Sequence, residues 1–163
     1  PVVIPYPIHH TYWWQMMKGD FLDVIFDCPF EMHEFLTDED YSKIIYDLKD
    51  SYKELIYYLY IRDYSTLFIG NLLGQTDRNI RGVRSTILSQ ITKKVIAVLL
   101  ERQEFDIPLW TTEREFMKKH KEKIPDIQRK AKKEKEKIIR EIGVLARKVL
   151  KQYQKNITSP TNC

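Results

Sequence analysis

The sequence predicts an all-α fold: a compact helical bundle that contains a helix-turn-helix and ends in a long basic helix. Apolar residues recur at intervals of three and four over long stretches, which is the period of one buried helical face. Residue types that cap helices precede several of these stretches. The 163 residues, 43% of them hydrophobic, are enough for one domain with extensions or for two very small domains.

The first 36 residues are predicted to form an aromatic, acidic extension (residues 1–36) that packs on the core. Residues 1–10 contain three prolines and should be extended, whereas residues 11–18 favour a short helix. A dense apolar cluster follows between Phe21 and Phe30, with the spacing of a helical turn that faces a core. We expect this cluster to pack against the next helices; the alternative is a docking surface for a partner.

Residues 37–104 are predicted to form the helix-turn-helix domain, which begins with two helices. Thr37 and the three acidic residues after it mark the start of the first helix. The expected inner face of this helix consists of Tyr41, Ile44, Ile45 and Leu48. Ser51 and Glu54 have the spacing of a capping box at the start of the second helix. That helix is expected to bury Leu55, Ile56 and Leu59.

Residues 66–73 are predicted to form a third helix, joined by a tight corner to a fourth that begins at Asp77. Ser65 is the candidate N-cap of the third helix. Its expected inward residues are Leu67, Ile69, Leu72 and Leu73. Gly74 can adopt the left-handed conformation that ends a helix, and Thr76 can cap the next one. Helices joined in this way are the commonest means by which a small domain places side chains in the DNA major groove.

The fourth helix carries an apolar stripe and three arginines. The stripe consists of Ile80, Val83, Ile87, Ile91, Val95 and Val98. Arg78, Arg81 and Arg84 are expected to lie outside it, where guanidinium groups can bind phosphates or the edge of guanine. The alternative is a solvated helical face. Gly82 weakens the helix by about 1 kcal/mol relative to alanine, unless the backbone must approach another surface closely.

The segment from Tyr64 to Arg84 contains a series of short motifs. They are Tyr64-Ser65-Thr66, Ile69, Leu72-Leu73-Gly74, Thr76-Asp77-Arg78-Asn79-Ile80-Arg81 and Val83-Arg84. In these motifs the chain resembles the last DNA-binding region of bacterial RNA polymerase sigma factors, and the resemblance covers about Asp38 to Leu100. It implies sequence-specific binding of double-stranded DNA in transcription initiation or its regulation, with the fourth helix in the major groove. RNA polymerase, or a second sigma-like subunit, is the protein partner that the resemblance implies.

Carried over residue by residue, the resemblance also implies which side chains meet DNA. Arg78 and Arg81 fall where side chains would meet bases, whereas Thr76 and Arg84 would meet phosphate. The candidate DNA-binding residues are therefore Thr76, Arg78, Asn79, Arg81, Arg84 and Ser85. The chain departs from the family at three positions. Phe68 stands where the family commonly has an acidic residue, Gly70 where it has alanine, and Gly82 where it has a longer side chain. Nothing before Asp38 resembles the promoter-melting region of a complete sigma factor, so the chain is expected to be either a fragment or a truncated relative.

Residues 105–155 are predicted to form a charged helical extension, and residues 156–163 a disordered tail. A first helix in this extension is expected to run to about Lys123, capped by Thr111 or Thr112. Its expected anchors are Trp110 and Phe116.

After an interruption at Pro125, a long helix is predicted from Asp126 to about Lys155. Its first half contains the charge run 129–137, which is either a solvated face or a source of nonspecific phosphate affinity. Its second half has an apolar seam of two heptads, formed by Ile138, Ile142, Leu145 and Val149. A seam of this length indicates contact with a partner helix, which includes self-association, or with the body of the domain.

Charge is divided unevenly between the two parts of the chain. Residues 1–60 carry four basic and eleven acidic side chains, whereas residues 61–163 carry twenty-three basic and twelve acidic ones. The net charge of the whole chain is +4. A basic surface attracts a polyanion, and the resulting binding weakens with salt. We therefore expect the basic part to face DNA and the acidic part to stay off the duplex.

Several other classes of protein do not fit the sequence. Cys28 and Cys163 make neither a disulfide framework nor a zinc site, which fits the reducing cytoplasm. We find no signal peptide and no stretch that approaches the roughly 20 apolar residues of a membrane span. The four histidines form no metal-binding motif and no glycine-rich phosphate loop occurs, so neither an enzyme nor a cofactor or metal is expected. The alternative to DNA binding is a helical adaptor that docks a partner protein.

Overall fold

Helices account for most of the structure of this chain. The computed structural model describes residues 32–158, with side chains as far as Lys151. Its elements are η1 (Met32–Phe35), α3 (Glu39–Tyr46), α4 (Asp50–Ile56), η2 (Tyr57–Ile61), α5 (Thr66–Leu73), α6 (Asp77–Glu101), α7 (Glu113–Lys119), η3 (Lys121–Lys123) and α8 (Ile124–Thr158). No strand occurs within residues 32–158, which confirms the predicted all-α class. The expectations for residues 1–31 lie outside the described part of the chain.

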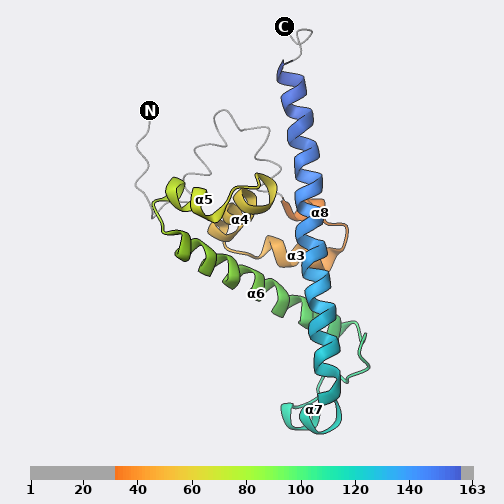
Figure 1. Ribbon diagram of the computed structural model, residues 1–163. Helices are drawn as coiled ribbons and strands as arrows, with labels where there is room; N and C mark the ends of the chain where they lie inside the picture. The colour runs from red at the N-terminus through yellow and green to blue at the C-terminus, as the bar shows by residue number, and fades with distance from the viewer. Residues whose placement is uncertain (1–31, 159–163) are drawn as a thin grey trace.

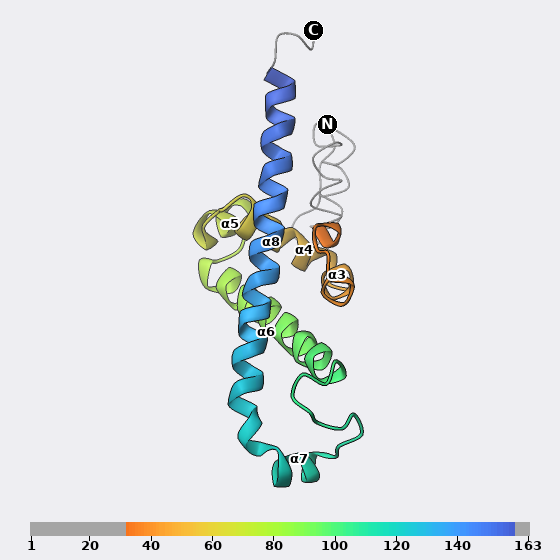
Figure 2. The ribbon, with the colours of Figure 1, turned by 90° about the vertical axis from the view of Figure 1, so that its right-hand side faces the viewer.

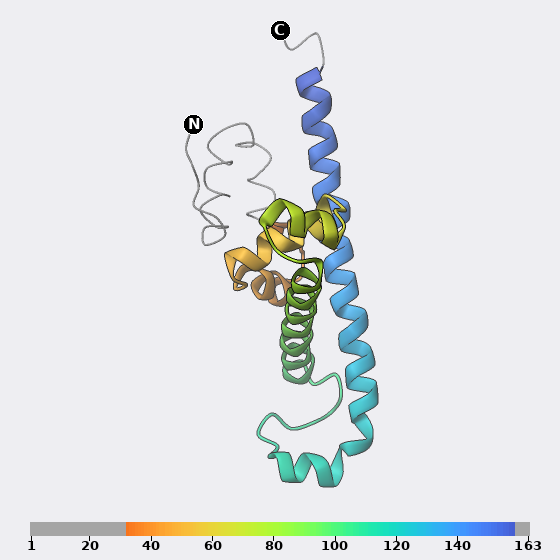
Figure 3. The same cartoon turned by 60° about the vertical axis from the view of Figure 1, so that its left-hand side comes forward.

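Two long helices, α6 and α8, form the frame of the molecule (Figure 1). They pack against each other, along one another in the view of Figure 3 but at an angle in that of Figure 1, while α3 and α5 also pack on α6. The core lies between these helices and includes the fully buried side chains of Met32, Ile45, Ile56, Ile69, Ile91 and Ile142. The C-terminal part of α8 projects beyond the other described helices, and α7 lies at the opposite end (Figures 1 and 2).

The start of the domain confirms one predicted helix and corrects a predicted cap. Asp38 caps α3 by accepting hydrogen bonds from the backbone of Asp40 and Tyr41, and the four residues of the predicted inner face are all buried. The capping box expected for α4 is wrong. That helix begins at Asp50, after a Lys49 cap that makes no side-chain bond, so Ser51 already lies inside its first turn. Glu54 is buried in the core, with 1% of its surface exposed, and reaches no backbone amide.

The second predicted helix changes its winding before it ends. After Ile56 the chain forms the wider π-helical turn η2, in which the amide of Arg62 donates to the carbonyl of Tyr57 over 2.9 Å. Helix α8 lies directly on this turn: a Cβ atom at Gly143 would stand 2.8 Å from the carbonyl oxygen of Tyr60. Glycine at this position therefore allows the two backbones to approach closely.

The connection between α6 and α8 differs from the sequence prediction in three respects. Thr112 caps α7 as expected, but α7 ends at Lys119 and is followed by the short helix η3. Pro125 does not interrupt a helix; it lies in the first turn of α8, where an amide hydrogen has no helical partner and its absence costs nothing. Trp110 is not a core anchor, because 93% of its surface is exposed.

Helix α8 packs on the body of this chain along one side. The buried residues of that side are Ile127, Ala131, Ile138, Ile142, Ala146 and Leu150. Helix α8 packs on α6, η2 and η1, and Ile138 and Ile142 of the predicted seam belong to the core. The seam therefore contacts the body of the domain, although its Leu145 and Val149 are only half-buried. The helix continues to Thr158, three residues into the segment predicted as a disordered tail. Within residues 32–158 no helix has both the length and the apolar character needed to cross a membrane.

Candidate nucleic-acid interface

The corner between α5 and α6 is built from local caps. The hydroxyl of Ser65 accepts from the amide of Phe68 over 3.1 Å, and that of Thr76 accepts from the amide of Asn79 over 3.0 Å. Gly74 ends α5 with φ 66° and ψ 31°, the left-handed conformation that glycine adopts without a steric penalty. The bounds of residues 66–73, both N-caps and the glycine cap are therefore confirmed.

Close packing at the corner depends on a second glycine. A Cβ atom at Gly70 would lie 2.6 Å from the backbone oxygen of Gln75 and 3.3 Å from the carbonyl carbon of Thr76. These are backbone atoms, which cannot rotate away as the end of a side chain can. Glycine at position 70 thus lets α5 lie directly against the chain that leads into α6.

A side-chain network fixes the start of α6 relative to α5. The hydroxyl of Thr66, in the first turn of α5, donates to the carboxylate of Asp77 in the first turn of α6. Asp77 also lies 3.3 Å from the guanidinium of Arg81, one helical turn further on. The carboxylate therefore orients Arg81 and is suited to the positive end of the α6 dipole.

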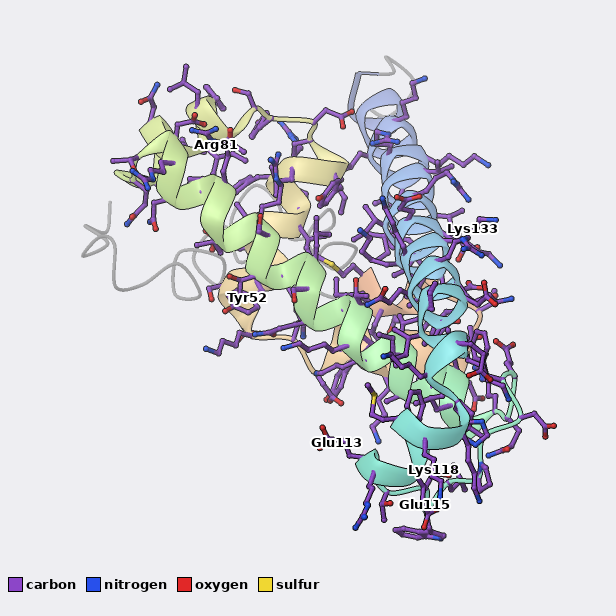
Figure 4. The ribbon with its side chains drawn as sticks, turned by 60° about the horizontal axis from the view of Figure 1, so that its bottom comes forward. Tyr52, Arg81, Glu113, Glu115, Lys118 and Lys133 are labelled. Carbon is purple, nitrogen blue, oxygen red and sulfur yellow. The ribbon has the colours of Figure 1, made fainter. Side chains whose placement is uncertain are left out.

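One exposed side of α6 carries three of the six candidate DNA-binding residues. Arg78, Arg81 and Ser85 follow one another at intervals of three and four and are exposed. Figure 4 shows Arg81 near the N-terminal end of the helix. Gly82 lies on the same side, with no described atom within 4 Å of an added Cβ. Asp77 is the only acidic residue in the first three turns of α6; it is half-buried and pairs with Arg81. This side of the helix is therefore positively charged and open.

Arg84 does not share that exposed side. It follows Ile80 by four residues and precedes Ile87 by three, which places it with the buried stripe, and it is half-buried. Its positive charge lies near Tyr60: burial raises the pKa of the Tyr60 hydroxyl, and the charge of Arg84 partly offsets that rise. The expectation that all three arginines lie outside the apolar stripe is wrong for Arg84.

Two other candidate residues have structural roles at the corner. The hydroxyl of Thr76 is engaged as the cap of α6, and the side-chain amide of Asn79 donates to the side chain of Gln75. Asn79 lies at a cavity of about 210 Å³ between α4 and the corner, which Tyr52 also lines. The structure thus brings Arg78, Arg81 and Ser85 together and turns Asn79 and Arg84 to either side of them.

An apolar patch beside this surface was missed by sequence reasoning. Leu67, Phe68 and Leu72 are exposed on α5, with 60% of the surface of Leu67 accessible, although Leu67 and Leu72 were expected to face inward. Their helix buries only Ile69, Gly70 and Leu73. Since five of the eight residues of α5 are large and apolar, its hydrophobic pattern could not show which side is buried.

The lysines of α8 lie apart from the α6 surface. Within residues 126–151 this helix exposes nine basic and two acidic side chains. Lys133, in the middle of the charge run, lies on the far side of the molecule from Arg81 (Figure 4). The two basic surfaces therefore face different directions.

Comparison of the chain with protein families, with curated proteins and with solved structures finds no match. Residues 32–158 contain no group of three or more histidine, cysteine, aspartate or glutamate side chains placed to hold a metal ion. The surface at the start of α6 presents cationic guanidinium groups and a hydroxyl group, which suit a partner rich in hydrogen-bond acceptors.

Proposed function

We propose that this chain binds double-stranded DNA with the first turns of α6 in the major groove. Its role would be in transcription initiation or its regulation in the cytoplasm, as the resemblance to the last DNA-binding region of sigma factors implies. RNA polymerase or a second sigma-like subunit would be its protein partner. We expect no catalytic activity.

The observation that carries this proposal is the exposed side of α6 shared by Arg78, Arg81 and Ser85. A guanidinium group can bind the O6 and N7 atoms of guanine together, and a hydroxyl can bind either bases or phosphate. The open space at Gly82 supports the proposal, because it lets the helix backbone lie close to a groove. The ion pair between Arg81 and Asp77 spans one turn of an exposed helix and is weak enough for Arg81 to exchange it for a base.

A second candidate function is that of a protein-interaction adaptor. It is favoured by the exposed apolar patch of Leu67, Phe68 and Leu72 on α5. Apolar side chains grouped in this way on a surface often mark a site of protein contact. In this alternative the two-helix corner presents α5, and the arginines of α6 lie at the edge of the contact.

The test is selection of bound fragments from random duplex DNA, followed by affinity measurements with the full chain at several salt concentrations. Arg81→Ala should weaken binding to the selected sequence by about 1–3 kcal/mol and relax the preference at one position. Arg114→Ala is the matched control, because Arg114 is an exposed arginine on α7 with no ion pair to a described residue. This variant should bind DNA as the parent chain does.

Two outcomes would contradict DNA recognition by α6. One is equal loss of affinity in the Arg81 and Arg114 variants, which would indicate only general attraction to charge. The other is unchanged DNA affinity in Arg81→Ala together with lost binding of a protein partner in Phe68→Ser, which would favour the adaptor. Thermal unfolding of each variant shows whether the fold is retained.

A further inference from the structure

A cavity of about 420 Å³ lies between the end of η2 and the C-terminal half of α8. Its floor is apolar and includes the buried side chains of Ile61 and Leu150. Its rim is basic and consists of Arg62, Arg147, Lys148 and Lys151, with Asp63 as the acidic member. Small-molecule sites typically enclose about 300–1,000 Å³ and combine an apolar lining with a few polar groups, as this cavity does.

Both arginines at the rim are held in place by the fold. One guanidinium nitrogen of Arg147 donates to the carbonyl oxygen of Tyr60 over 2.7 Å and lies 3.4 Å from the carboxylate of Asp63. The guanidinium of Arg62 lies over the ring of Tyr64 at 5.5 Å and donates to its hydroxyl over 3.2 Å. Arginines positioned before a ligand arrives lose less entropy on binding it.

The charge at this rim is left largely uncompensated. Lys148 and Lys151 make no ion pair with any described residue, and Asp63 faces solvent with 71% of its side chain exposed. Four cations therefore surround the cavity against one exposed carboxylate. Such an excess of one sign beside an apolar wall raises the local concentration of anions.

The backbone at the cavity is unusual in two ways. Asp63 has φ 55°, in the left-handed region that side-chain-bearing residues rarely occupy. It lies two residues after the end of η2, and π-helical turns of this kind frequently occur at functional sites. Gly143, which lets α8 approach the carbonyl of Tyr60, directly precedes Val144, a residue of the cavity lining.

We propose that this cavity binds a small phosphate-bearing molecule with an apolar or aromatic part, such as a nucleotide. The phosphates lie among Arg62, Arg147, Lys148 and Lys151, because charge-assisted hydrogen bonds from arginine and lysine to phosphate are the strong ones. The apolar part covers the floor formed by Ile61 and Leu150. The site involves none of the residues exposed at the start of α6, so it stands whether or not the chain binds DNA.

Calorimetric titration of the full chain with ATP, pyrophosphate and adenosine at about 0.15 M salt tests this site. ATP should bind saturably at one site, pyrophosphate more weakly and adenosine hardly at all. Exchanging Lys148 and Lys151 together for glutamine should weaken ATP binding about tenfold or more, since two charge-assisted contacts are lost. The matched control exchanges Lys132 and Lys133, which lie on α8 outside the cavity and lose the same charge; it should keep the parent affinity.

A variant on another element makes the test independent of α8. Arg62→Gln should weaken ATP binding while the helical circular dichroism of the protein is retained. The proposal is overturned if neither ATP nor pyrophosphate binds saturably, or if the Lys132 and Lys133 control loses as much affinity as the Lys148 and Lys151 variant. It is also overturned if a short DNA duplex, and not ATP, is the ligand whose binding depends on Lys148 and Lys151.

Discussion

At the scale of single residues, two helix glycines show that the same residue type can have opposite structural meanings. Gly70 is pressed against backbone atoms at the corner, whereas Gly82 faces open space on the exposed side of α6. Both lie inside helices, where glycine is less favourable than alanine by about 1 kcal/mol. Their surroundings, and not their helix propensity, decide what an added methyl group does.

Gly82→Ala and Gly70→Ala should therefore change stability in opposite directions. Alanine at position 82 should stabilise the fold by about 0.5–1 kcal/mol, because it meets no neighbour and restricts the unfolded chain. Alanine at position 70 should destabilise it by about 1–3 kcal/mol, because α5 must move away from the corner. Urea unfolding measures both changes. A rise in stability for both variants would show that the corner is more loosely packed than described.

Glu54 is a buried carboxylic acid without a hydrogen-bond partner among residues 32–158. Both of its oxygens are buried, and burial raises its pKa to about 8. The group is therefore neutral in the folded protein between about pH 4.5 and 8, where it is ionised in the unfolded chain. Its protonation links folding to pH.

The sign of this linkage follows from where the proton is held. Between about pH 4.5 and 8 the folded protein keeps a proton on Glu54 that the unfolded chain has lost, so the free energy of unfolding should fall by up to about 1.4 kcal/mol per pH unit. Glu54→Gln should remove this contribution and gain stability relative to the parent chain as the pH rises. Urea unfolding of both proteins at pH 5.5 and pH 8 measures the difference. An equal pH dependence in the two proteins would show that Glu54 is ionised in the fold.

At the scale of elements, the end of α6 is tied to the start of α3 by one arginine. Arg102 lies 2.7 Å from the carboxylates of both Asp38 and Asp40, and its guanidinium lies 5.3 Å from the ring centre of Tyr41. A hydrogen bond from Arg102 holds the pKa of Asp38 below its usual value. The same aspartate caps α3, so the ion pair and the cap support each other.

Arg102→Ala should destabilise the fold by about 1 kcal/mol at pH 7, a modest value because the partly exposed pair is screened by solvent. The contribution should vanish in acid as the pH falls through the lowered pKa of Asp38. Arg129→Ala is the control, since its ion pair with Asp126 joins two residues of the same helix and is worth less than about 0.5 kcal/mol. Equal losses in the two variants, measured by thermal unfolding, would contradict a linking role for Arg102.

Some helix ends could be predicted from the sequence and others could not. The ends of α5 and the start of α6 were predicted correctly because caps depend on residues that are neighbours in the chain. The start of α4 and the end of α7 were predicted wrongly. Ser51 can serve either as a cap or inside a helix, and the residues after Lys119 can either continue the helix or end it. Packing against other helices chose between those alternatives.

At the scale of the whole molecule, the two basic surfaces are separated by the body of the protein. Arg81 lies near the N-terminal end of α6, and Lys133 lies on α8 at the opposite side of the molecule (Figure 4). We therefore expect a straight duplex that lies against the exposed side of α6 not to contact Lys133. At physiological salt, charges further apart than about 8 Å are largely screened from one another.

Exchanging Lys132, Lys133 and Lys137 together for glutamine should therefore leave DNA affinity within about twofold at 0.15 M salt. These lysines make no ion pair with a described residue, so their removal should not disturb the fold. At low salt the association rate should fall, because attraction then acts over a longer range. Fluorescence anisotropy and stopped-flow mixing measure the two effects. A loss at 0.15 M salt as large as that of Arg78→Ala would mean that DNA also contacts α8.

The sequence by itself determined the helical class, the corner after Leu73 and the capping residues on both sides of it. Each of these depends on interactions between residues close together in the chain, whose spacing is visible in the sequence. Arg78 and Arg81 could be named as exposed for the same reason, since they lie outside the apolar period of α6.

Only the tertiary structure decided which side of α5 is buried, that Arg84 turns toward Tyr60 and that Glu54 enters the core. It also decided that Arg102 meets the start of α3 and that α8 closes a basic cavity against η2. These features join residues far apart in the chain, so they follow from the way the helices pack against one another, which no local period or cap encodes.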